Sequence, residues 1–325
     1  MAQVQFGWAL PMPALQGEYS SQPAYLERLA LALELVGQHF HSVWCTDHLQ
    51  YQHYKILEGW TMITYLAPLF PHLNFGNLVL NQSFRNPGLV AKMATTFQYM
   101  SGGRLILGLG AGWNEEEYKA YGYPFPSACK RVAELEEAIQ IMQALWREEC
   151  VTMRGEHYQV AEARCVPRPV TVPPIVIGAS RPRMLNVVAH YADWWSGNKM
   201  TLNEYRQQKD ECDRACLAVP RDPRTLRRTI FEECVCRSTE QELQPFRHQN
   251  PFLHDFLGTP AQIIERMQEF IGLGVDYFMF DTGDLSDLTT LELLVHEVFP
   301  VIQNNNGRQP SPEYTEPLMD TLPQQ

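Results

Sequence analysis

The chain has 325 residues, and 37 acidic against 26 basic side chains give it a net charge of −11. A hydrophobic fraction of 45% with 19% charged residues is typical of an ordinary globular protein, which excludes a disordered or collagen-like chain. The acidic balance argues against non-specific nucleic-acid binding and against a basic membrane-surface protein.

The sequence carries no sign of a membrane or secretory segment. No stretch approaches the ~18 uninterrupted apolar residues that a bilayer span needs, and residues 1–8 lack the basic start of a signal peptide. The 8 cysteines include no C-x-x-C pair, so we expect reduced thiols rather than a zinc site. We therefore expect a cytoplasmic protein that binds neither membrane nor nucleic acid.

Short β-branched runs alternate with amphipathic helical stretches along most of the chain. Strands are expected at residues 4–10, 42–46, 73–80, 104–109, 175–177, 193–196, 229–236 and 275–280. Helices are expected between them at residues 25–39, 59–69, 87–99, 182–191, 202–217, 259–273 and 288–301. Extra segments interrupt this order: helices at 115–121 and 131–146, a hairpin within 151–172, and an irregular insertion at 240–256.

Eight strand–helix units with crossover-length connections predict a parallel sheet. We favour a closed (β/α)8 TIM barrel over an open, doubly wound sheet, because eight such units fill one barrel. The expected domain is a single barrel over residues 1–303, with insertions at about 113–172 and 238–257. Residues 304–325 are rich in proline and without apolar periodicity, which predicts a flexible tail.

Polar and small residues gather where the predicted strands end, which is where barrel enzymes place their chemistry. The residues that we select from these positions are Asp47, His48, Asn81, Gly110, Gly112, Trp113, Gly178, Ala179, Ser180 and Asn198.

Gly178, Ala179 and Ser180 directly precede a helix, with Arg181 and Arg183 close by. Small residues let the backbone approach a ligand, and first-turn N–H groups favour an anion, so we interpret this turn as a phosphate cradle. The alternative is a tight turn in which the serine caps the helix.

Asp47 and His48 form the one adjacent acid and imidazole pair at a strand end. A histidine beside a carboxylate suits proton transfer or a hydrogen bond to a reduced cofactor, with Asp47 orienting His48. The alternative is structural, with Asp47 as a cap and His48 as a wall residue.

Three other chemistries find less support. The glycines from Gly108 to Gly112 lack the third glycine of a dinucleotide fingerprint, because Trp113 stands in its place. They suit a flat ring lying against the strand end instead. His39 and His41 precede a strand, on the stability face of a barrel, so we expect no metal site. No nucleophile elbow supports acyl transfer.

Several segments together resemble the bacterial luciferase-like family of flavin- and deazaflavin-dependent oxidoreductases. The likeness covers about residues 4–302 and is carried by Asp47-His48 and by the segments 86–92, 101–112, 174–184, 192–194 and 258–276. It implies a (β/α)8 barrel, a ring-shaped redox cofactor at the carboxyl face, a phosphate at Gly178–Ser180, and a homodimer. It also implies a non-proline cis peptide at Leu78–Val79, beside the ring.

The resemblance favours the deazaflavin coenzyme F420, with FMN as the alternative, because the run from Gly110 to Tyr118 looks more like the deazaflavin-dependent branch. Some sugar-phosphate dehydrogenases of that branch have a glutamate where Trp113 stands, so that acid is not carried over. Arg85, Arg181, Arg183 and Lys199 are candidates for the anionic tail of F420, or equally surface residues.

The leading hypothesis is therefore hydride transfer between F420 and a small organic substrate. His48 would be the proton shuttle beside the ring, Asp47 its orienting group, and Asn81, Trp113 and Asn198 part of the pocket wall. Two alternatives stay open: an FMN-dependent monooxygenase that receives reduced flavin from a separate reductase and uses O2, and a barrel that binds flavin without turnover.

Overall fold

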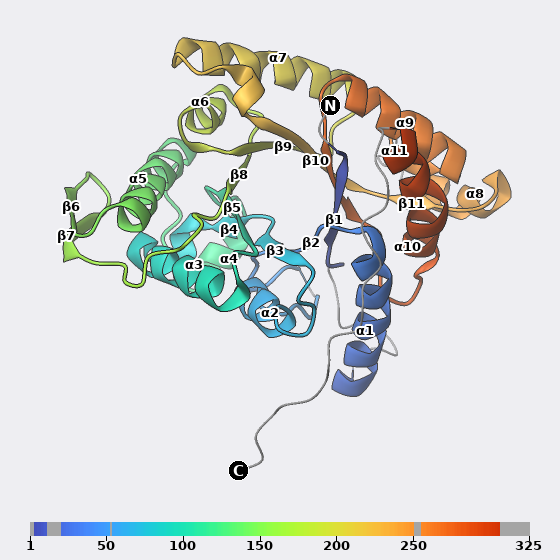
Figure 1. Cartoon of the computed structure of the whole chain (residues 1–325), viewed down its shortest axis with the longest axis horizontal. Coiled ribbons are helices and arrows are strands. Elements are labelled where there is room, and N and C mark those ends of the chain that lie inside the picture. Colours follow the sequence, from blue (N-terminus) through green and yellow to red (C-terminus); the bar gives the residue numbers. More distant parts are fainter. Residues whose placement is uncertain (1–2, 12–20, 53, 250–254, 306–325) are drawn as a thin grey trace.

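The structure, a computed structural model, describes residues 3–11, 21–52, 54–249 and 255–305. Eight parallel strand positions form a closed ring with helices around it (Figure 1). The strands are β1 (Gln5–Ala9), β2 (Ser42–Cys45), β3 (Asn74–Asn77) with its continuation β4 (Leu80–Asn81), β5 (Leu105–Gly110), β8 (Ile175–Gly178), β9 (Trp194–Asn198), β10 (Arg227–Glu233) and β13 (Tyr277–Asp281). The predicted (β/α)8 barrel is confirmed.

The strand order explains how the ring closes. Neighbours run β3-β2-β1-β13-β10-β9-β8-β5, and β3 then pairs with β5 through Phe75 opposite Leu105. All of these pairs are parallel, because each connection crosses back over the outside of the sheet as a helix.

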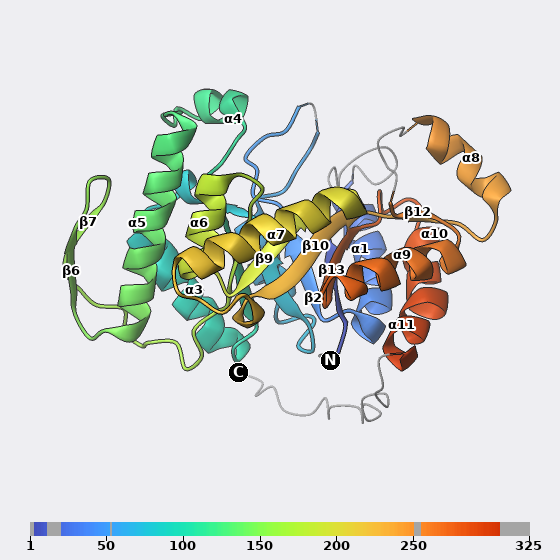
Figure 2. The ribbon, with the colours of Figure 1, turned by 90° about the horizontal axis from the view of Figure 1, so that it is seen from above.

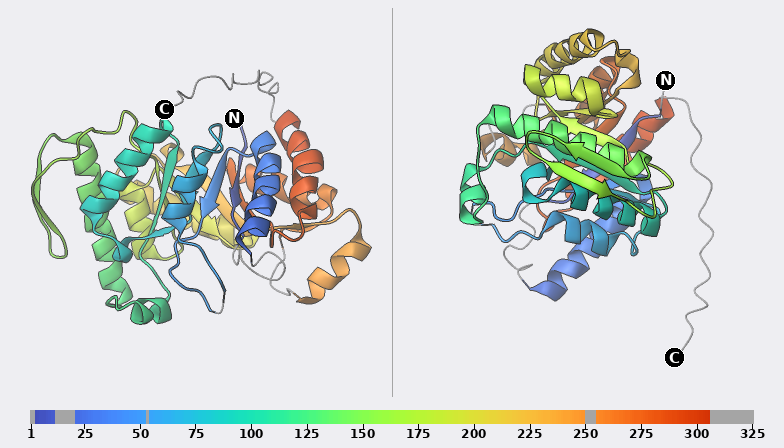
Figure 3. Two further views of the ribbon diagram at one scale, coloured as in Figure 1. Left: turned by 90° about the horizontal axis from the view of Figure 1, so that it is seen from below. Right: turned by 90° about the vertical axis from the view of Figure 1, so that its left-hand side faces the viewer.

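The outer helices follow the strands in the expected order (Figures 2 and 3). They are α1 (Gln22–His39), α2 (Gly59–Leu66), α3 (Pro87–Ser101), α4 (Glu115–Ala120), α5 (Ala128–Arg147), α6 (Pro182–Tyr191), α7 (Leu202–Ala218) and α9 (Pro260–Gly272). Helix α3 begins as expected, since the Asn86 side chain accepts from the Gly88 N–H and Pro87 fills the first position.

Three segments differ in detail from the sequence prediction. The third strand is split into β3 and β4, and the Leu78–Val79 peptide between them is cis, as expected from the resemblance. The insertion expected to be irregular contains the helix α8 (Glu240–Gln249). This helix lies between β11 (Val235–Cys236) and β12 (Leu257–Gly258), which form a short parallel pair. The last helix consists of three parts that follow one another without a break: α10 (Thr289–Leu293), a π-helical turn (Leu294–Val298) and α11 (Phe299–Asn305).

The predicted insertion before the fifth strand holds α4, α5 and an antiparallel hairpin of β6 (Val151–Arg154) and β7 (Gln159–Ala163). The hairpin projects beside α5, and α8 projects at the opposite side of the barrel (Figure 2). Of the predicted tail, residues 306–325 lie outside the described residues. Within the described part of the chain, no helix is both long and apolar enough to cross a membrane.

Two cores hold the barrel together. A small one fills the interior with inward-facing side chains of several strands, among them Trp44, Ile106, Tyr277 and Met279. A larger one lies between the outer face of the strands and the helices. Since the interior is packed, a ligand that binds to the barrel strands has to bind at their ends, and barrel enzymes use the carboxyl ends.

Candidate active site

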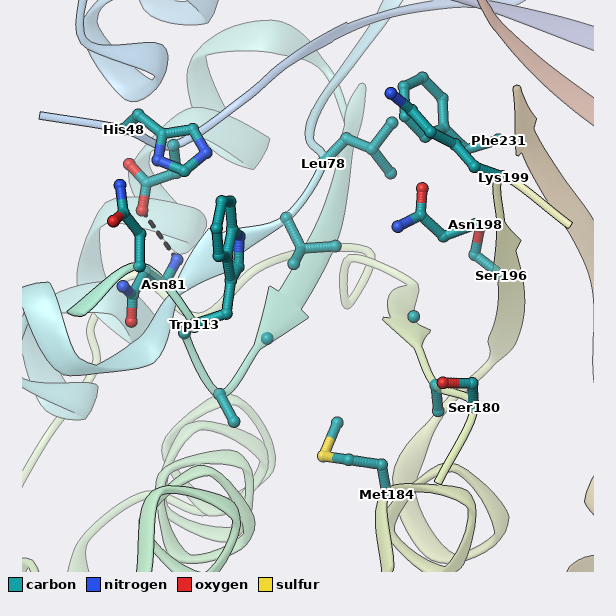
Figure 4. Close-up of a pocket in the computed structure, with 18 of the residues that line it drawn as sticks. His48, Leu78, Asn81, Trp113, Ser180, Met184, Ser196, Asn198, Lys199 and Phe231 are labelled. Atoms are coloured by element: carbon teal, nitrogen blue, oxygen red, sulfur yellow. Dashed lines mark hydrogen bonds between the residues drawn. The ribbon is translucent and has the colours of Figure 1, made fainter. Parts of the chain in front are cut away.

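A pocket of about 500 Å³ opens at the carboxyl ends of the strands. Every site residue selected from the sequence or the resemblance lines it, including Leu78 and Val79. In Figure 4, His48, Asn81 and Trp113 stand on one side, and Asn198, Lys199 and Phe231 on the other, with Leu78 between them. The parallel topology causes this convergence, because it brings six strand ends to one face.

His48 is held by a residue that the sequence analysis did not select. Its Nδ1 lies 3.0 Å from Oε2 of Glu117, the third residue of α4, and the Glu117 side chain is only 1% exposed. The other carboxylate oxygen of Glu117 accepts the backbone N–H groups of Leu49 and Gln50. Glu117 therefore fixes both the imidazole and the backbone that follows it, and leaves Nε2 of His48 free to exchange a proton.

Asp47 does not orient His48, so that part of the prediction is wrong. One Asp47 oxygen accepts the backbone N–H of Asn81 at 2.7 Å, and both oxygens accept from the Arg85 guanidinium at 2.9 Å. Arg85 also donates to Glu58 at 2.5 Å. Asp47 thus ties the end of β2 to the end of β4, and Arg85 is occupied by two carboxylates rather than free for an anionic tail.

An aromatic wall borders the histidine. The His48 ring lies 5.2 Å from the Tyr51 ring and 5.9 Å from the Trp113 indole, and the last two rings are 6.1 Å apart. Trp113 remains 64% exposed in spite of these contacts. A large aromatic face open to the pocket is suited to covering a flat or apolar ligand.

The glycines of the fourth strand have a different role from the one expected. A Cβ on Gly108 would lie 2.0 Å from the Asn77 carbonyl oxygen, and one on Gly110 would lie 2.5 Å from Val79 Cγ2. Gly112 has φ +72°, and a Cβ there would meet the Tyr118 hydroxyl. These glycines make room for the end of the third strand, so the space beside Gly108 is not available to a ring.

The turn after β8 has the properties expected of an anion cradle. A Cβ on Gly178 would have no neighbour nearer than 3.9 Å, so bare backbone faces open pocket there. The Ala179 carbonyl accepts from Trp195 Nε1 at 2.9 Å, which holds the turn in place. The N-cap of α6 is Arg181, with no side-chain cap bond, so the alternative of a capping serine is wrong. An anion at this turn would meet backbone N–H groups and an uncapped helix end.

This geometry gives a first prediction. Gly178→Leu would place a side chain in the open space of the turn, so we expect the affinity for a phosphate-bearing cofactor to fall by at least about tenfold, a loss of about 1.4 kcal/mol. The melting temperature should stay close to the parent value, since no atom obstructs the new Cβ. Gly272→Leu, at the end of α9 with no atom within 4 Å of its Cβ, is the matched control. Unchanged cofactor affinity in Gly178→Leu would show that the phosphate binds elsewhere.

On the opposite side of the pocket, carboxylates lie behind the lining residue Lys199. Burial raises the pKa of Asp281, at the end of β13, to about 7, and the nearby Glu233 contributes. Burial likewise raises the pKa of Glu232 to about 8, although its side chain accepts the Met200 N–H at 2.7 Å. Lys199 is the cation of this group, and its ammonium pairs with Glu233.

Raised pKa values of acids have a defined effect on stability. Between the ordinary carboxyl pKa of about 4 and the raised values of about 7 and 8, the folded state binds more protons than the unfolded chain, so stability is lost as the pH rises through this range. We expect the variant with Asp281→Asn and Glu232→Gln to show a flatter decline in melting temperature than the parent from pH 5 to pH 8. Scanning calorimetry across this range measures it, and parallel curves would contradict it.

Within the described residues, no group of three or more His, Cys, Asp or Glu side chains is placed to hold a metal ion. His41, one of the two histidines weighed as metal ligands, instead contacts the Tyr277 hydroxyl and Asn74. Burial lowers the pKa of His41 to about 4.

Fold and pocket together define a (β/α)8-barrel protein with a small-molecule site at the carboxyl face. The sequence model of the luciferase-like monooxygenase family matches residues 4–254, which is most of the chain. The chain belongs to this family.

Two curated relatives illustrate the cofactors found among similar proteins. An F420-dependent glucose-6-phosphate dehydrogenase of Amycolatopsis mediterranei is 33% identical over 174 residues, which are 52% of this chain and 50% of that protein. An FMNH2-dependent dimethylsulfone monooxygenase of Pseudomonas putida is 21% identical over 260 residues, covering 67% of this chain and 71% of that protein. The chain thus matches about half the length of the first relative.

A solved structure has the same fold over nearly its whole length. An F420-dependent secondary alcohol dehydrogenase, determined with an F420–acetone adduct, superimposes with a TM-score of 0.77 and covers 93% of this chain and 99% of that one. At 16% sequence identity this likeness shows the fold alone.

Proposed function

We propose that this protein is an F420-dependent oxidoreductase that moves a hydride between the deazaflavin and a small organic substrate. The observation that carries the proposal is the presence, in one pocket, of the bonded pair His48–Glu117 and the bare turn at Gly178. The first gives a site for proton exchange, and the second a site for the phosphate of a cofactor. The sequence similarity to F420-dependent enzymes supports the choice of coenzyme.

The described residues fit a deazaflavin, which when bound supplies the two-electron acceptor or donor. Gly178, Ala179 and Ser180 would hold its phosphate through backbone N–H groups. Leu78 and Val79, which line the middle of the pocket, would support one face of the ring and leave the other to the substrate. His48 would take the hydroxyl proton of an alcohol through Nε2, or return it in the reverse direction, while Glu117 stabilises the imidazolium.

An FMN-dependent monooxygenase is the second candidate. It is favoured by the similarity to the dimethylsulfone monooxygenase, which extends over more of both chains than the similarity to the dehydrogenase. This candidate requires reduced flavin from a separate reductase, and the same phosphate turn would serve FMN.

Titration of the purified protein with F420 and, separately, with FMN tests the proposal. A ligand at one hundred times its dissociation constant stabilises the folded state by about 2.7 kcal/mol, which is a clear shift in the melting temperature. We expect F420 to give this shift at lower concentration than FMN. A stronger shift with FMN would favour the monooxygenase, and no shift with either would refute the proposed function.

We also propose a homodimer that forms through α2 and α3. Exposed apolar side chains gather on and beside these helices, where a groove of about 410 Å³ lies between them; they include Tyr65, Leu69, Leu89, Tyr99 and Met100. A second copy would cover this surface with the same surface of its own, as a two-fold interface does. Light scattering should give twice the chain mass for the parent and one chain mass for Met100→Glu. A monomeric parent would refute the dimer.

A reducing compartment such as the cytoplasm is our proposal for its location. All eight cysteines are free in the structure, and six of them are buried. Oxidising compartments favour disulfides, which this arrangement does not use.

A further inference from the structure

The far side of the pocket, which is lined by the ends of β9 and β10, has a lysine with acidic side chains beside it. Lys199 lines the pocket there, directly after β9, and lies next to Asn198 and Phe231 in Figure 4. Its ammonium pairs with Glu233 at the end of β10. Asp281, at the end of β13, also interacts with both Lys199 and Glu233.

The backbone holds Lys199 in this position. Its φ is +49°, a left-handed conformation that is uncommon for a residue with a side chain. The Lys199 N–H donates to the Phe231 carbonyl at 2.9 Å, and the next N–H, of Met200, donates to Glu232 at 2.7 Å. Two strand-end residues of β10 therefore fix the loop, so the ammonium stays beside the carboxylates.

Each acidic or basic side chain that lines the pocket is paired with a group of opposite type. Among the described lining residues, the ionisable acids and bases are Asp47, His48, Glu117 and Lys199. Asp47 pairs with Arg85, Glu117 with His48, and Lys199 with Glu233. A dianionic phosphate at the substrate end would have to displace Glu233 from Lys199, and it would then lie beside the freed Glu233 carboxylate and near Asp281, which interacts with both residues. Like charges at such short range disfavour its binding.

The rest of this end of the pocket is apolar or aromatic. Phe231, Met184 and Met200 line one side, and Tyr51 and Trp113 face them from the other. Amide and hydroxyl groups of Asn198 and Ser196 supply neutral polar contacts. This composition suits a compact apolar body with one hydroxyl or carbonyl group.

We propose that the substrate of this protein is an uncharged alcohol or carbonyl compound with an apolar body, and that the carboxylates around Lys199 exclude phosphorylated substrates. The proposal rests on the proposed function and narrows it. It separates this chain from relatives that are named for glucose 6-phosphate, despite the sequence similarity.

Isothermal calorimetry on the cofactor-loaded protein tests whether the carboxylates around Lys199 exclude phosphates. Glucose 6-phosphate and inorganic phosphate are the probes. We expect no saturable binding of either probe to the parent at millimolar concentration. The variant with Glu233→Gln and Asp281→Asn releases Lys199, so we expect it to gain at least about tenfold in affinity for glucose 6-phosphate. Glu211→Gln, a half-buried carboxylate of α7 that does not line the pocket, is the matched control and should behave as the parent.

Two results would overturn the inference. One is saturable binding of glucose 6-phosphate to the parent that Lys199→Met abolishes, because Lys199 would then be an anion site. The other is the absence of any gain in the double variant, because the carboxylates would then not be the cause of exclusion. A turnover screen of uncharged alcohols against their phosphate esters gives a second readout, and activity on the esters alone would also overturn it.

Failure of the proposed function gives a different pattern. In that case neither F420 nor FMN binds, and the calorimetry is repeated on the protein without cofactor. The comparison of the parent with Lys199→Met then separates binding at Lys199 from binding at the Gly178 turn, so the exclusion of phosphates at Lys199 is still tested.

Discussion

His48→Ala is expected to lower kcat by about 10²- to 10⁴-fold, the usual contribution of a positioned acid or base, while cofactor affinity stays close to that of the parent. The reason is that His48 lines the pocket with one nitrogen committed to Glu117 and the other available for a substrate proton. The phosphate turn at Gly178 and the wall residue Leu78 come from other strands and are left intact. Steady-state kinetics with the preferred cofactor and a fluorescence titration of that cofactor measure the two quantities.

His190→Ala is the matched control for this experiment. His190 is an exposed histidine of α6 whose ring nitrogen bonds to the Asn186 carbonyl of the same helix. Its replacement should leave kcat and cofactor affinity unchanged. Unchanged turnover in His48→Ala would remove His48 from the mechanism, and a parallel loss of cofactor affinity would make it a binding residue instead.

The sequence was sufficient to predict the barrel and the location of the site, because both depend on periodicity. Eight strand–helix repeats determine a parallel ring, and a parallel ring brings every strand end to one face. The selected residues therefore met in one pocket even though they came from several segments far apart in the sequence. The predicted role of each residue was less secure, because a role depends on which way its side chain points.

The pair Asp47-His48 shows this difficulty. Successive side chains of an extended chain point to opposite sides, so neighbours in sequence rarely bond to each other. In the structure Asp47 turns towards Arg85 and Asn81, while His48 turns towards Glu117. The alternation was available from the sequence and argues against Asp47 as the orienting group. The true partner of His48, Glu117, lies 69 positions away, and nothing in the sequence shows that these two residues meet.

Glu117 was missed for a related reason. It is the third of three consecutive glutamates at the start of α4. From the sequence, all three are equally well explained as favourable charges at a helix N-terminus. Only Glu117 is buried, together with Tyr118, whereas Glu115 and Glu116 are exposed. A six-residue helix is too short for its apolar periodicity to show which side faces the protein.

Glu117→Gln is expected to lower kcat by about 10²- to 10³-fold with little loss of stability. The amide oxygen of glutamine can still accept the Leu49 and Gln50 N–H groups, so the backbone after β2 keeps its partner. The amide nitrogen would face Nδ1 of His48, and since it is a donor, Nδ1 must become the acceptor. The proton then resides on Nε2, and the imidazole can no longer accept a proton from the substrate.

Two readouts separate this effect from a merely structural one. Nitrogen NMR shifts of His48 should report the Nδ1–H tautomer in the parent and the Nε2–H tautomer in Glu117→Gln, and the pH profile of kcat should lose the limb that belongs to the histidine. Glu116→Gln, its exposed neighbour, is the control. Glu117→Ala, by contrast, leaves the Leu49 and Gln50 N–H groups without their acceptor, at about 1–3 kcal/mol each. Parent-like turnover in Glu117→Gln would mean that His48 works without a fixed tautomer, and the assignment of Glu117 as its positioning residue would be withdrawn.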